Sequence, residues 1–532
     1  MEKKVAIIGA GVSGLLACKY ALSKGYHPTV FEAKGNIGGV WTKTLETTKL
    51  QTPRPYYQFS DFPWPDSVTE EYPSQRKVFP YLESYARHFD LYQYIRFHRK
   101  VIGINFEGPS DKEMVAWTQW GGSSDPFGSK GKWKVIVPDT QNSTNEVHEF
   151  DFVIVCIGKF SDAPNFPHFP PGEGPEVFNG KVMHCIEYSD LDFNAAHELV
   201  RGKQVTIVGF QKYALDVALE CARVNGPKNP CTILYRRAHW NLPDALPFGI
   251  PLGYLFFNRV LGLAVHKPGE GFWEWLLAVL LSPLRWGVVK CMEIYIKRLH
   301  WLDKWGIVPE HSILDDLGSC VTSIVPDGFF EAVAEGSIIL KKAPWIRFCR
   351  DGIYTDDQSK PLKTNLVIMA TGFRGLDKLK DIFVSPAFQD LLVGESDKIL
   401  PLYRDCIQPR IPQMAIIGFT ESFANLYTAE MRCRWLAELL DGKFKLPSIA
   451  EMEKDIAKWD KFQKDAAGKY FHRSCSGTIH VWANDQICKD MGWNPKRKKG
   501  FFANLFDPYL PTEYTQPNPT FGSKDGKGGK LN

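Results

Sequence analysis

The stretch KKVAIIGAGVSGLLACKYALSKGYHPTVFEAKGNIGGVW spans residues 3–41, and its pattern decides the fold at the start of the chain. Val5–Ile8 predict a short β-strand, and the apolar spacing of Leu15–Leu22 predicts a helix directly after it. The segment PTVFE predicts a second strand, which ends at Glu32. Three glycines in the pattern G-x-G-x-x-G separate the first strand from the helix: Gly9, Gly11 and Gly14. This order of elements predicts a Rossmann-like dinucleotide-binding unit.

Each of these glycines has a physical reason to be where it is. Gly9 allows the tight turn, Gly11 lets the backbone approach a pyrophosphate, and Gly14 lets helix and strand pack closely. The helix N-terminus offers free amide donors to phosphates. Glu32 can accept a hydrogen bond from a ribose hydroxyl and would repel a 2′-phosphate, so FAD or NAD is favoured over NADP at this site.

A second glycine pair follows closely, in the sequence GGVW of residues 38–41. Such a pair is often seen in FAD-binding Rossmann domains, and it points to FAD as the ligand of the first unit. The candidate binding residues in it are Gly39, Val40 and Trp41.

A second strand–turn–helix–strand pattern begins at KQVTIVGF, with Gly209 in the first glycine position. Gln211 and Ala214 replace the next two glycines, and Lys212 and Tyr213 complete the turn. Alanine is accepted at the third position, so Gln211 is the serious departure. A side chain there is expected to hold a pyrophosphate further off or to force a different turn.

The strand that closes this second unit, CTILYRR, ends in Arg236 and Arg237 instead of an acid. Arginine binds a 2′-phosphate through bidentate hydrogen bonds, so the second unit is predicted to prefer NADPH. Two alternatives stay open: a Rossmann-like domain that has lost its ligand, and ordinary solvated arginines. FAD followed by NADPH indicates hydride transfer from a nicotinamide to a flavin.

Composition limits the classes of protein further. A chain of 532 residues is too long for one core, and a net charge of +4 from 64 basic and 60 acidic residues does not call for a nucleic-acid partner. Twelve cysteines contain no CxxC pair, which argues against a zinc ribbon, a disulfide framework and a flavin disulfide reductase, and fits a reducing compartment. The sequence indicates no metal site, and its apolar start is explained by the glycine turn and not by a signal peptide.

Between the two units lies FNGKVMHCIEY, which places Phe178, Gly180, His184 and Tyr188 in the spacing F-x-G-x-x-x-H-x-x-x-Y. This spacing resembles the identifying motif of the flavin-containing monooxygenases. The resemblance implies that His184 positions the domains and does no acid–base work; a satisfied structural histidine is the alternative.

The resemblance continues over roughly residues 4 to 440. FSDFPWP resembles the family's aromatic–proline stretch near the flavin, and LVIMATGF, with Thr371 and Gly372, resembles a strand where the chain passes between domains. GFTESFANLYTAEMRCRW resembles the segment that closes the flavin domain and contains Asn425. Gln51 stands where animal members place an asparagine near the flavin, so the resemblance implies Gln51 and Asn425 as candidate catalytic residues.

The implied activity is that of the family. NADPH reduces FAD, oxygen adds to the flavin to give a hydroperoxide, and a nucleophilic nitrogen or sulfur of a small amine or thioether takes the distal oxygen. The closest likeness is to the plant branch tied to systemic acquired resistance, a plant defence, which N-hydroxylates pipecolic acid. Two alternatives are an uncoupled NADPH oxidase or flavin reductase that releases hydrogen peroxide, and a non-catalytic nucleotide-binding protein.

Residues 250–300 are unusually apolar, but no stretch reaches the length of 18 uncharged apolar residues that a spanning helix would need. A buried helical pair is favoured over an interfacial helix or an apolar substrate entrance. The segment KRKKGFFANLF, residues 496–506, sets a basic cluster beside aromatics and suggests peripheral membrane contact, with a solvated charge run as the alternative. The expected location is the cytoplasm, including the cytosolic face of the endoplasmic reticulum.

The predicted architecture is α/β, with two Rossmann-like dinucleotide-binding domains and a helical C-terminal extension. The FAD domain is discontinuous over 1–195 and 330–445, and the NADPH domain with its apolar insertion is placed between them at 196–329. The extension covers 446–510, and the Pro- and Gly-rich tail 511–532 is expected to be disordered.

Overall fold

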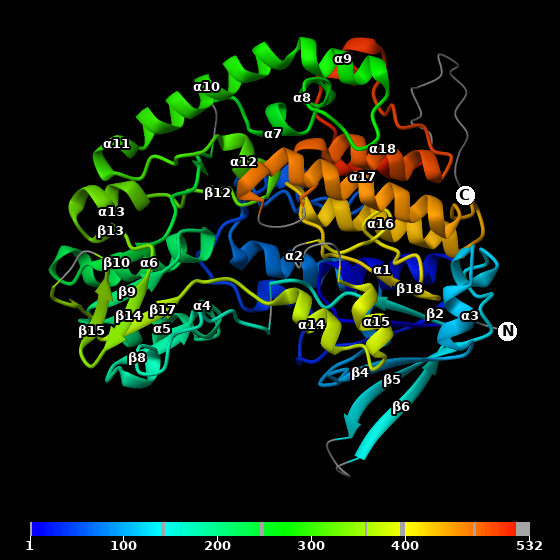
Figure 1. Cartoon of the computed structure of the whole chain (residues 1–532), viewed down its shortest axis with the longest axis horizontal. Coiled ribbons are helices and arrows are strands. Elements are labelled where there is room, and N and C mark those ends of the chain that lie inside the picture. The colour runs from blue at the N-terminus through cyan, green and yellow to red at the C-terminus, as the bar shows by residue number, and fades with distance from the viewer. Residues whose placement is uncertain are drawn as a thin grey trace.

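The computed structural model describes residues 3–139, 144–160, 162–244, 249–356, 359–393, 399–471 and 475–517. Its two parallel five-stranded sheets lie in separate lobes, with long helices across the top of both in the view of Figure 1. The α/β fold with two Rossmann-like units and a helical C-terminal part is therefore confirmed.

The first sheet has the strand order β18-β7-β1-β2-β3 and is parallel throughout. Its strands are β1 (Lys4–Ile8), β2 (His27–Phe31), β3 (Ile95–Arg96), β7 (Phe152–Val155) and β18 (Met414–Ile416). β1 is covered on both faces, because Val5 and Ile7 join the core around α1 (Val12–Ser23) and α16 (Asn425–Leu440), whereas Ala6 and Ile8 join a second core. An antiparallel meander supplies that second core: β4 (Gly103–Glu107), β5 (Lys132–Asp139) and β6 (Thr144–Phe150).

The second sheet has the order β13-β10-β9-β17-β8 and is also parallel. Its strands are β8 (Lys181–His184), β9 (Val205–Val208), β10 (Cys231–Tyr235), β13 (Ile338–Lys342) and β17 (Leu366–Met369). The helices α5 (Phe193–Val200), α6 (Lys212–Asn225) and α13 (Phe329–Glu335) belong to this lobe, as does the antiparallel group β14 (Ile346–Cys349), β15 (Gly352–Thr355) and β16 (Leu362–Lys363).

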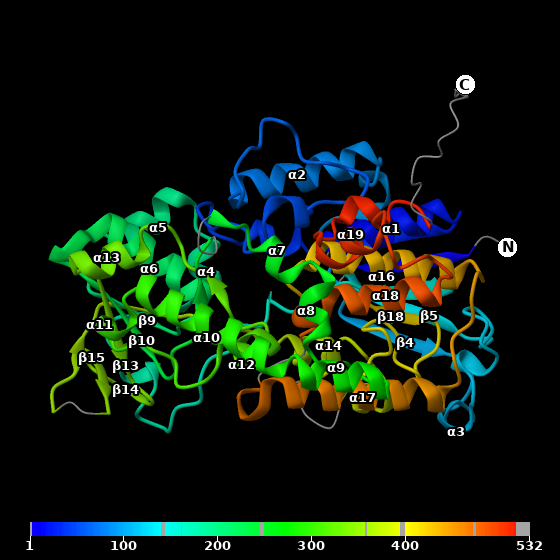
Figure 2. The ribbon, with the colours of Figure 1, turned by 90° about the horizontal axis from the view of Figure 1, so that it is seen from above.

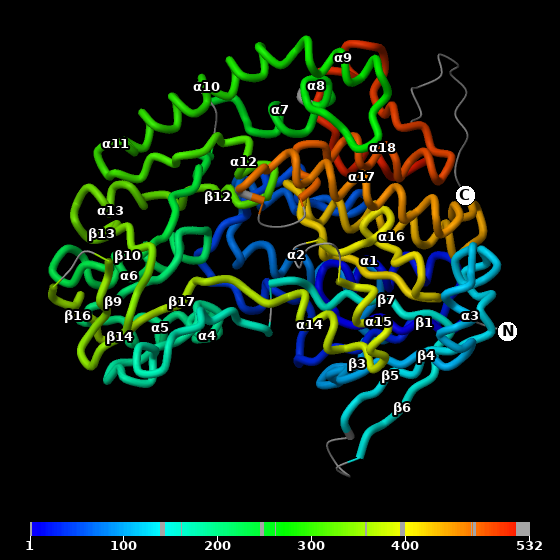
Figure 3. Tube along the Cα trace, viewed as in Figure 1, coloured from blue at the N-terminus to red at the C-terminus, as the bar shows by residue number. Residues whose placement is uncertain are grey.

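The second Rossmann unit is wider than the predicted range of 196–329. β8 precedes that range, and β13 and β17 follow it, yet all three are strands of the second sheet. The glycine turn marks the centre of this sheet and not its edges, so it gives no boundary for the outer strands. Figure 3 shows the chain leaving this lobe after β17 and entering the other at α14 (Gly375–Asp381).

An insertion extends between β11 (Asn241–Leu242) and β12 (Ser323–Ile324). Its helices are α7 (Gly253–Phe256), α8 (Arg259–Leu263), α9 (Phe272–Leu280), α10 (Ser282–Leu299), α11 (Leu302–Trp305) and α12 (Ile313–Gly318). The favoured expectation of a buried helical pair is wrong, because Trp273 on α9 is 77% exposed and Trp286 on α10 is 65% exposed. Among the described residues no single helix has the length and apolarity of a membrane span; α9 and α10 together do, but they are bent by 48°.

The C-terminal extension is helical, with α17 (Ile449–Ala467), α18 (His480–Asp490) and α19 (Phe501–Phe506). It packs on both parts of the molecule, since α18 contacts α16 and α17 contacts α12. A disulfide between Cys320 and Cys475 joins the insertion to the extension. The twelve cysteines gave no reason to expect this bond, because its partners are 155 residues apart.

The predicted tail is in part ordered. Tyr514 is only 1% exposed, and Arg497 donates hydrogen bonds to the carbonyl oxygens of Gln516 and Pro517. The expectation of disorder is therefore wrong for residues 511–517, and residues 518–532 lie outside the described range. The remaining α-helices are α2 (Gln75–His88), α3 (Asp111–Val115), α4 (Cys185–Ser189) and α15 (Pro386–Leu391).

Candidate functional site

A cleft of about 1090 Å³ lies at the carboxyl ends of the first sheet's strands, where open α/β sheets bind their ligands. Seven residues singled out from the sequence line it: Gly9, Gly11, Glu32, Gly39, Val40, Trp41 and Asn425. The sequence-predicted residues of the first unit therefore converge on one cavity.

The first glycine turn leaves no room for side chains. Gly9 has a φ of +102°, and a Cβ placed on it would lie 2.6 Å from the carbonyl oxygen of Cys156. A Cβ on Gly14 would lie 1.9 Å from the carbonyl oxygen of Gly9. Gly14 does not line the cleft; it allows α1 to pack against the turn that forms the cleft's floor.

The second glycine pair faces this turn. Gly39 has a φ of +57°, and a Cβ on it would lie 3.1 Å from the Cα of Gly11. Gly38 N donates to Ala10 O at 2.9 Å, which ties the two loops together. No described side chain caps α1, so its first amide groups point toward the bare backbone between the loops. A dinucleotide pyrophosphate fits such a cradle of bare backbone and helix N-terminus.

Glu32 stands at the end of β2 and is 8% exposed. Its Oε2 accepts from Ala10 N at 2.7 Å and its Oε1 accepts from Lys34 N at 2.9 Å. The carboxylate therefore fixes the glycine turn, and each oxygen keeps a further lone pair for a ribose hydroxyl.

The cleft also has charged walls that sequence reasoning missed. Lys159, after β7, forms an ion pair with Glu421 at 3.1 Å, and Arg432 on α16 is paired with Asp405. Lys378 Nζ donates to Ile157 O at 2.7 Å, and burial lowers its pKa despite the nearby Asp162. The available signal was position: Lys159 and Glu421 follow strands of the first sheet, and Lys378 and Arg432 lie on α14 and α16.

The two candidate catalytic residues are not brought together. Asn425 lines the cleft at the start of α16, where its Oδ1 accepts from Ser422 N at 2.8 Å and its amide NH₂ has no hydrogen-bond partner within the described part of the chain. Gln51 is exposed, does not line this cleft, and accepts from Ile324 N at 3.3 Å. The structure does not bring Gln51 to this cleft, because its side chain is turned toward β12.

The second turn has a backbone similar to that of the first, but a side chain stands at its second glycine position. Gly209 has a φ of +137°, and a Cβ on it would lie 2.4 Å from Ala370 O. Gln211 precedes α6 with a φ of −110°, a conformation open to any residue, and makes no capping bond. The substitution has therefore left the turn itself unchanged. Lys212 Nζ is bound to Asp216 Oδ1 at 2.7 Å, within its own helix.

The other predicted residues of the second unit surround this turn. Tyr213 lies against Phe373, with ring centroids 6.0 Å apart, and burial raises the pKa of its hydroxyl. Arg236 is exposed and Arg237 half-buried, directly after β10. Thr371 and Gly372 follow β17, outside the lining of the first cleft, and Thr371 Oγ1 donates to Asn165 O.

The spaced motif between the units is structural in its contacts. His184 is fully buried; its Nε2 donates to Gly372 O at 2.9 Å and its Nδ1 accepts from Ile186 N at 3.3 Å. Burial lowers the pKa of this imidazole, which stays neutral. Phe178 and Tyr188 are buried, and a Cβ on Gly180 would lie 2.3 Å from the Phe178 ring. The contacts of His184 join the end of β8 to the segment where the chain leaves the second lobe.

Comparison with known proteins agrees with this geometry. Residues 2–514 match the model of a family described as flavin-binding monooxygenase-like. The chain is 39% identical to the probable flavin-containing monooxygenase 1 of Arabidopsis thaliana over 96% of each chain. It is 26% identical to the N-oxide-forming dimethylaniline monooxygenase 2 of Rattus norvegicus, over 96% of this chain and 86% of that one. The structure of OTEMO in complex with FAD and NADP superposes with a TM-score of 0.64 at 15% identity, over 92% of this chain and 98% of that one.

The two Rossmann units and the glycine-lined cleft define a class, that of the two-dinucleotide oxidoreductases. Within that class, the match over nearly the whole sequence decides the family. The chain belongs to the flavin-binding monooxygenase-like family and is a flavin-containing monooxygenase of plant type.

Proposed function

We propose that this enzyme uses NADPH and O₂ to oxygenate a nitrogen or sulfur atom of a small nucleophilic substrate. The carrying observation is the pair of opposed glycine loops, in which a Cβ on Gly39 would lie 3.1 Å from Gly11. That cradle fits the pyrophosphate of FAD, the flavin cofactor of the family. FAD, when bound, supplies the electron transfer and the activation of oxygen.

The residues of this chain would bind FAD and orient it and the substrate. The bare backbone at Gly9 and Gly11 and the N-terminus of α1 would hold the pyrophosphate, and Glu32 the ribose. Asn425 presents its amide NH₂ to the cleft, because its oxygen is already engaged with Ser422 N. An amide donor fixed in this way can orient a substrate or a cofactor carbonyl without changing its charge.

NADPH is the reductant that the second unit supports. Arg236 and Arg237 follow β10, next to the free N-terminus of α6. A guanidinium pair suits the 2′-phosphate, and the helix N-terminus suits the pyrophosphate. Gln211 adds an amide at the point where the first unit has only backbone, which we interpret as a device for retaining NADP⁺ after hydride transfer.

The finer proposal is N-hydroxylation of pipecolic acid in plant defence. It is supported by the 39% identity to a plant flavin-containing monooxygenase and by the N-oxide-forming activity that the name of the rat relative states. A secondary amine is a soft nucleophile of the kind that such enzymes oxygenate. A thioether has the same property and is the competing substrate class.

The test is product formation under ¹⁸O₂ by the FAD-loaded enzyme with NADPH. Pipecolic acid should gain one ¹⁸O on nitrogen, while a thioether and a primary amine serve as competing substrates. Sulfoxide as the only product would contradict the pipecolate assignment and leave the monooxygenase class intact. NADPH consumption that yields one hydrogen peroxide per NADPH and no labelled product would favour the uncoupled oxidase instead.

A further proposal concerns location: the chain contacts the cytosolic surface of a membrane, such as the endoplasmic reticulum. Exposed aromatic and aliphatic side chains lie along α9 and α10, among them Trp273, Trp275 and Trp286. Three exposed phenylalanines lie on α19. Helices α9, α10 and α19 lie at the top of Figure 1, on the side that Figure 2 shows from above, and α8 contacts both α9 and α19. Lys496 and Lys499, both exposed, precede α19, so the surface combines apolar area with positive charge.

A further inference from the structure

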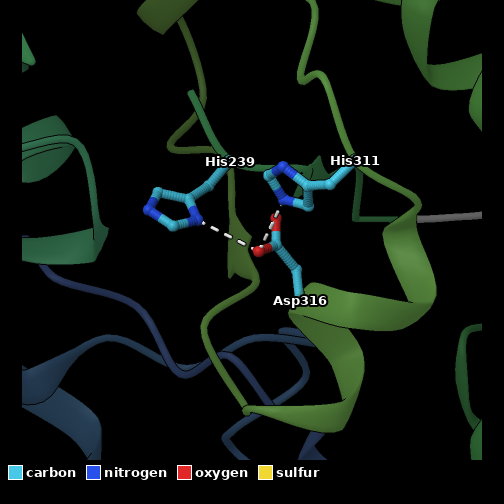
Figure 4. Close-up of side chains that lie close together, drawn as sticks. All are labelled: His239, His311 and Asp316. Atoms are coloured by element: carbon cyan, nitrogen blue, oxygen red, sulfur yellow. Dashed lines mark hydrogen bonds and ion pairs between the residues drawn. The ribbon is translucent and has the colours of Figure 1, made fainter. Parts of the chain in front are cut away.

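A compact group of two histidines and an aspartate lies in the second lobe, away from the glycine-lined cleft. His239 follows β10, His311 precedes α12, and Asp316 lies on α12. Figure 4 shows the three side chains pointing toward one another, and one ligand atom from each lies within 4.8 Å of the others. Segments more than 70 residues apart in the sequence therefore offer two imidazole nitrogens and a carboxylate to one point.

The geometry is close to that of a coordination sphere. His311 Nε2 lies 2.8 Å and His239 Nδ1 lies 3.1 Å from Asp316 Oδ1. A tetrahedral zinc ion with bonds of about 2.0 Å separates its ligand atoms by roughly 3.3 Å, so these two pairs need only small shifts. The two imidazole planes cross at 72°, which lets each nitrogen approach the same point from a different side.

Neighbouring hydrogen bonds fix the ligands. Asp316 Oδ2 accepts from Trp240 N at 2.8 Å, and Trp240 Nε1 donates to His311 O at 2.8 Å. Hydrogen bonds of this kind hold ligand side chains in place and preorganise metal sites.

We propose that His239, His311 and Asp316 bind one divalent transition metal ion of the zinc class. Two imidazoles and one carboxylate are borderline ligands that suit zinc, whereas calcium and magnesium require oxygen ligands throughout. His311 and Asp316 are buried, while the His239 side chain keeps 11% of its surface exposed. The fourth position opens on that side, where a water molecule completes the sphere.

Such an ion has a structural consequence for the nucleotide site. It joins α12 to the loop that carries Arg236 and Arg237, three and two residues before His239. Metal removal is then expected to weaken NADP⁺ binding through that loop. This consequence rests on the proposed NADPH role of the arginines, whereas metal binding itself does not.

The experiment is metal titration of the full-length, tag-free, FAD-loaded enzyme after treatment with a chelator. Calorimetry with Zn²⁺ is expected to give one ion per chain, and Co²⁺ to give the intense visible absorption of a tetrahedral site. His239→Gln is expected to weaken Zn²⁺ binding by about 10- to 100-fold. His300→Gln is the matched control, because His300 is a largely buried histidine of the same lobe that stacks on Phe330 outside the group.

Absence of stoichiometric binding, or equal binding by the wild type and His239→Gln, would overturn the site. If His239→Gln lost its fold, X-ray absorption of the Zn²⁺-loaded wild type would decide, since the site requires two imidazoles and one carboxylate. If Zn²⁺ binds but its removal leaves the NADP⁺ affinity unchanged, only the coupling between the two sites is overturned. If the metal-loaded wild type did not oxidise NADPH, that result would count against the proposed function and leave the metal site standing.

Discussion

Gly14 is the glycine of the first turn that tolerates a side chain least, since a Cβ there would lie 1.9 Å from Gly9 O. Gly14→Ala is expected to push α1 away from the turn, cost about 3 kcal/mol of folding stability and lower FAD affinity by at least tenfold. Flavin content after purification and thermal unfolding measure both effects. Gly287→Ala on α10 is the control, because nothing lies within 4 Å of its added methyl group and alanine favours helix. An FAD-replete, equally stable Gly14→Ala enzyme would contradict the cradle.

Gln211 permits a test of the altered second turn. Its backbone is extended, so Gln211→Gly removes the side-chain amide without relieving any strain. If the amide retains NADP⁺, the variant should bind NADP⁺ about tenfold more weakly, as expected for one lost hydrogen bond to a charged group. Gln204→Gly, in the same lobe but before β9, is the control. An unchanged dissociation constant of NADP⁺ for Gln211→Gly would remove the retention hypothesis.

His480 predicts a loss of stability in acid. Burial, and secondarily Arg432, lower its pKa from 6.5 to about 3. The unfolded chain therefore takes up this proton first, so stability is full above about pH 6.5 and falls as the pH drops toward the folded pKa. Between pH 7 and pH 5, His480 alone should lower the free energy of unfolding by about 2 kcal/mol, and His480→Gln should remove this part of the pH dependence. Urea unfolding at the two pH values measures it, with the exposed His168→Gln as control; equal slopes in all three proteins would refute the assignment.

At the level of elements, the Cys320–Cys475 disulfide is a covalent bond between the insertion and the C-terminal extension. Closing a loop of 155 residues is worth about 5 kcal/mol in the chain-entropy model, with typical measured values of about 2–4. Cys320→Ser is therefore expected to lower the melting temperature, and a reductant should do the same to the wild type but not to the variant. Cys291→Ser, at an exposed free cysteine, should have no effect. Equal melting temperatures for wild type and Cys320→Ser would mean that the bond does not form in solution.

Sequence patterns predicted elements well where local physics decides them. Gly9, Gly39 and Glu32 were found because a turn, a close backbone approach and a strand end each demand a particular residue type. Gln51 does not line the cleft, because its side-chain direction depends on β12, a segment distant in the sequence that packs beside it. The exposure of α9 and α10 could not be predicted either, since an apolar helix has the same sequence whether its partner is a core or an external surface.

At the scale of the whole molecule, long-range contacts decide what the chain alone leaves open. β8 and β17 belong to the second sheet although they flank the predicted domain, and they are paired directly, Met369 with His184. His184 then bonds to Gly372, where the chain leaves for the first lobe. The spaced motif thus fixes the connection between the two sheets.

Because apolar side chains are exposed on the face formed by α9, α10 and α19, we predict that the protein binds reversibly to anionic membranes. Trp273 is 77% exposed and Trp286 is 65% exposed, and each side chain that enters the lipid interface contributes about 1.5–3 kcal/mol. Sedimentation with vesicles that contain phosphatidylserine should carry down the wild type, more weakly at high salt because Lys496 and Lys499 contribute through charge. The double variant Trp273→Ser/Trp286→Ser should bind at least tenfold more weakly while its NADPH oxidation in solution stays unchanged. Trp345→Ser is the matched control, because Trp345 is 51% exposed beside β14 in the other part of the molecule. Equal sedimentation of the double variant and the control would show that this face does not contact lipid.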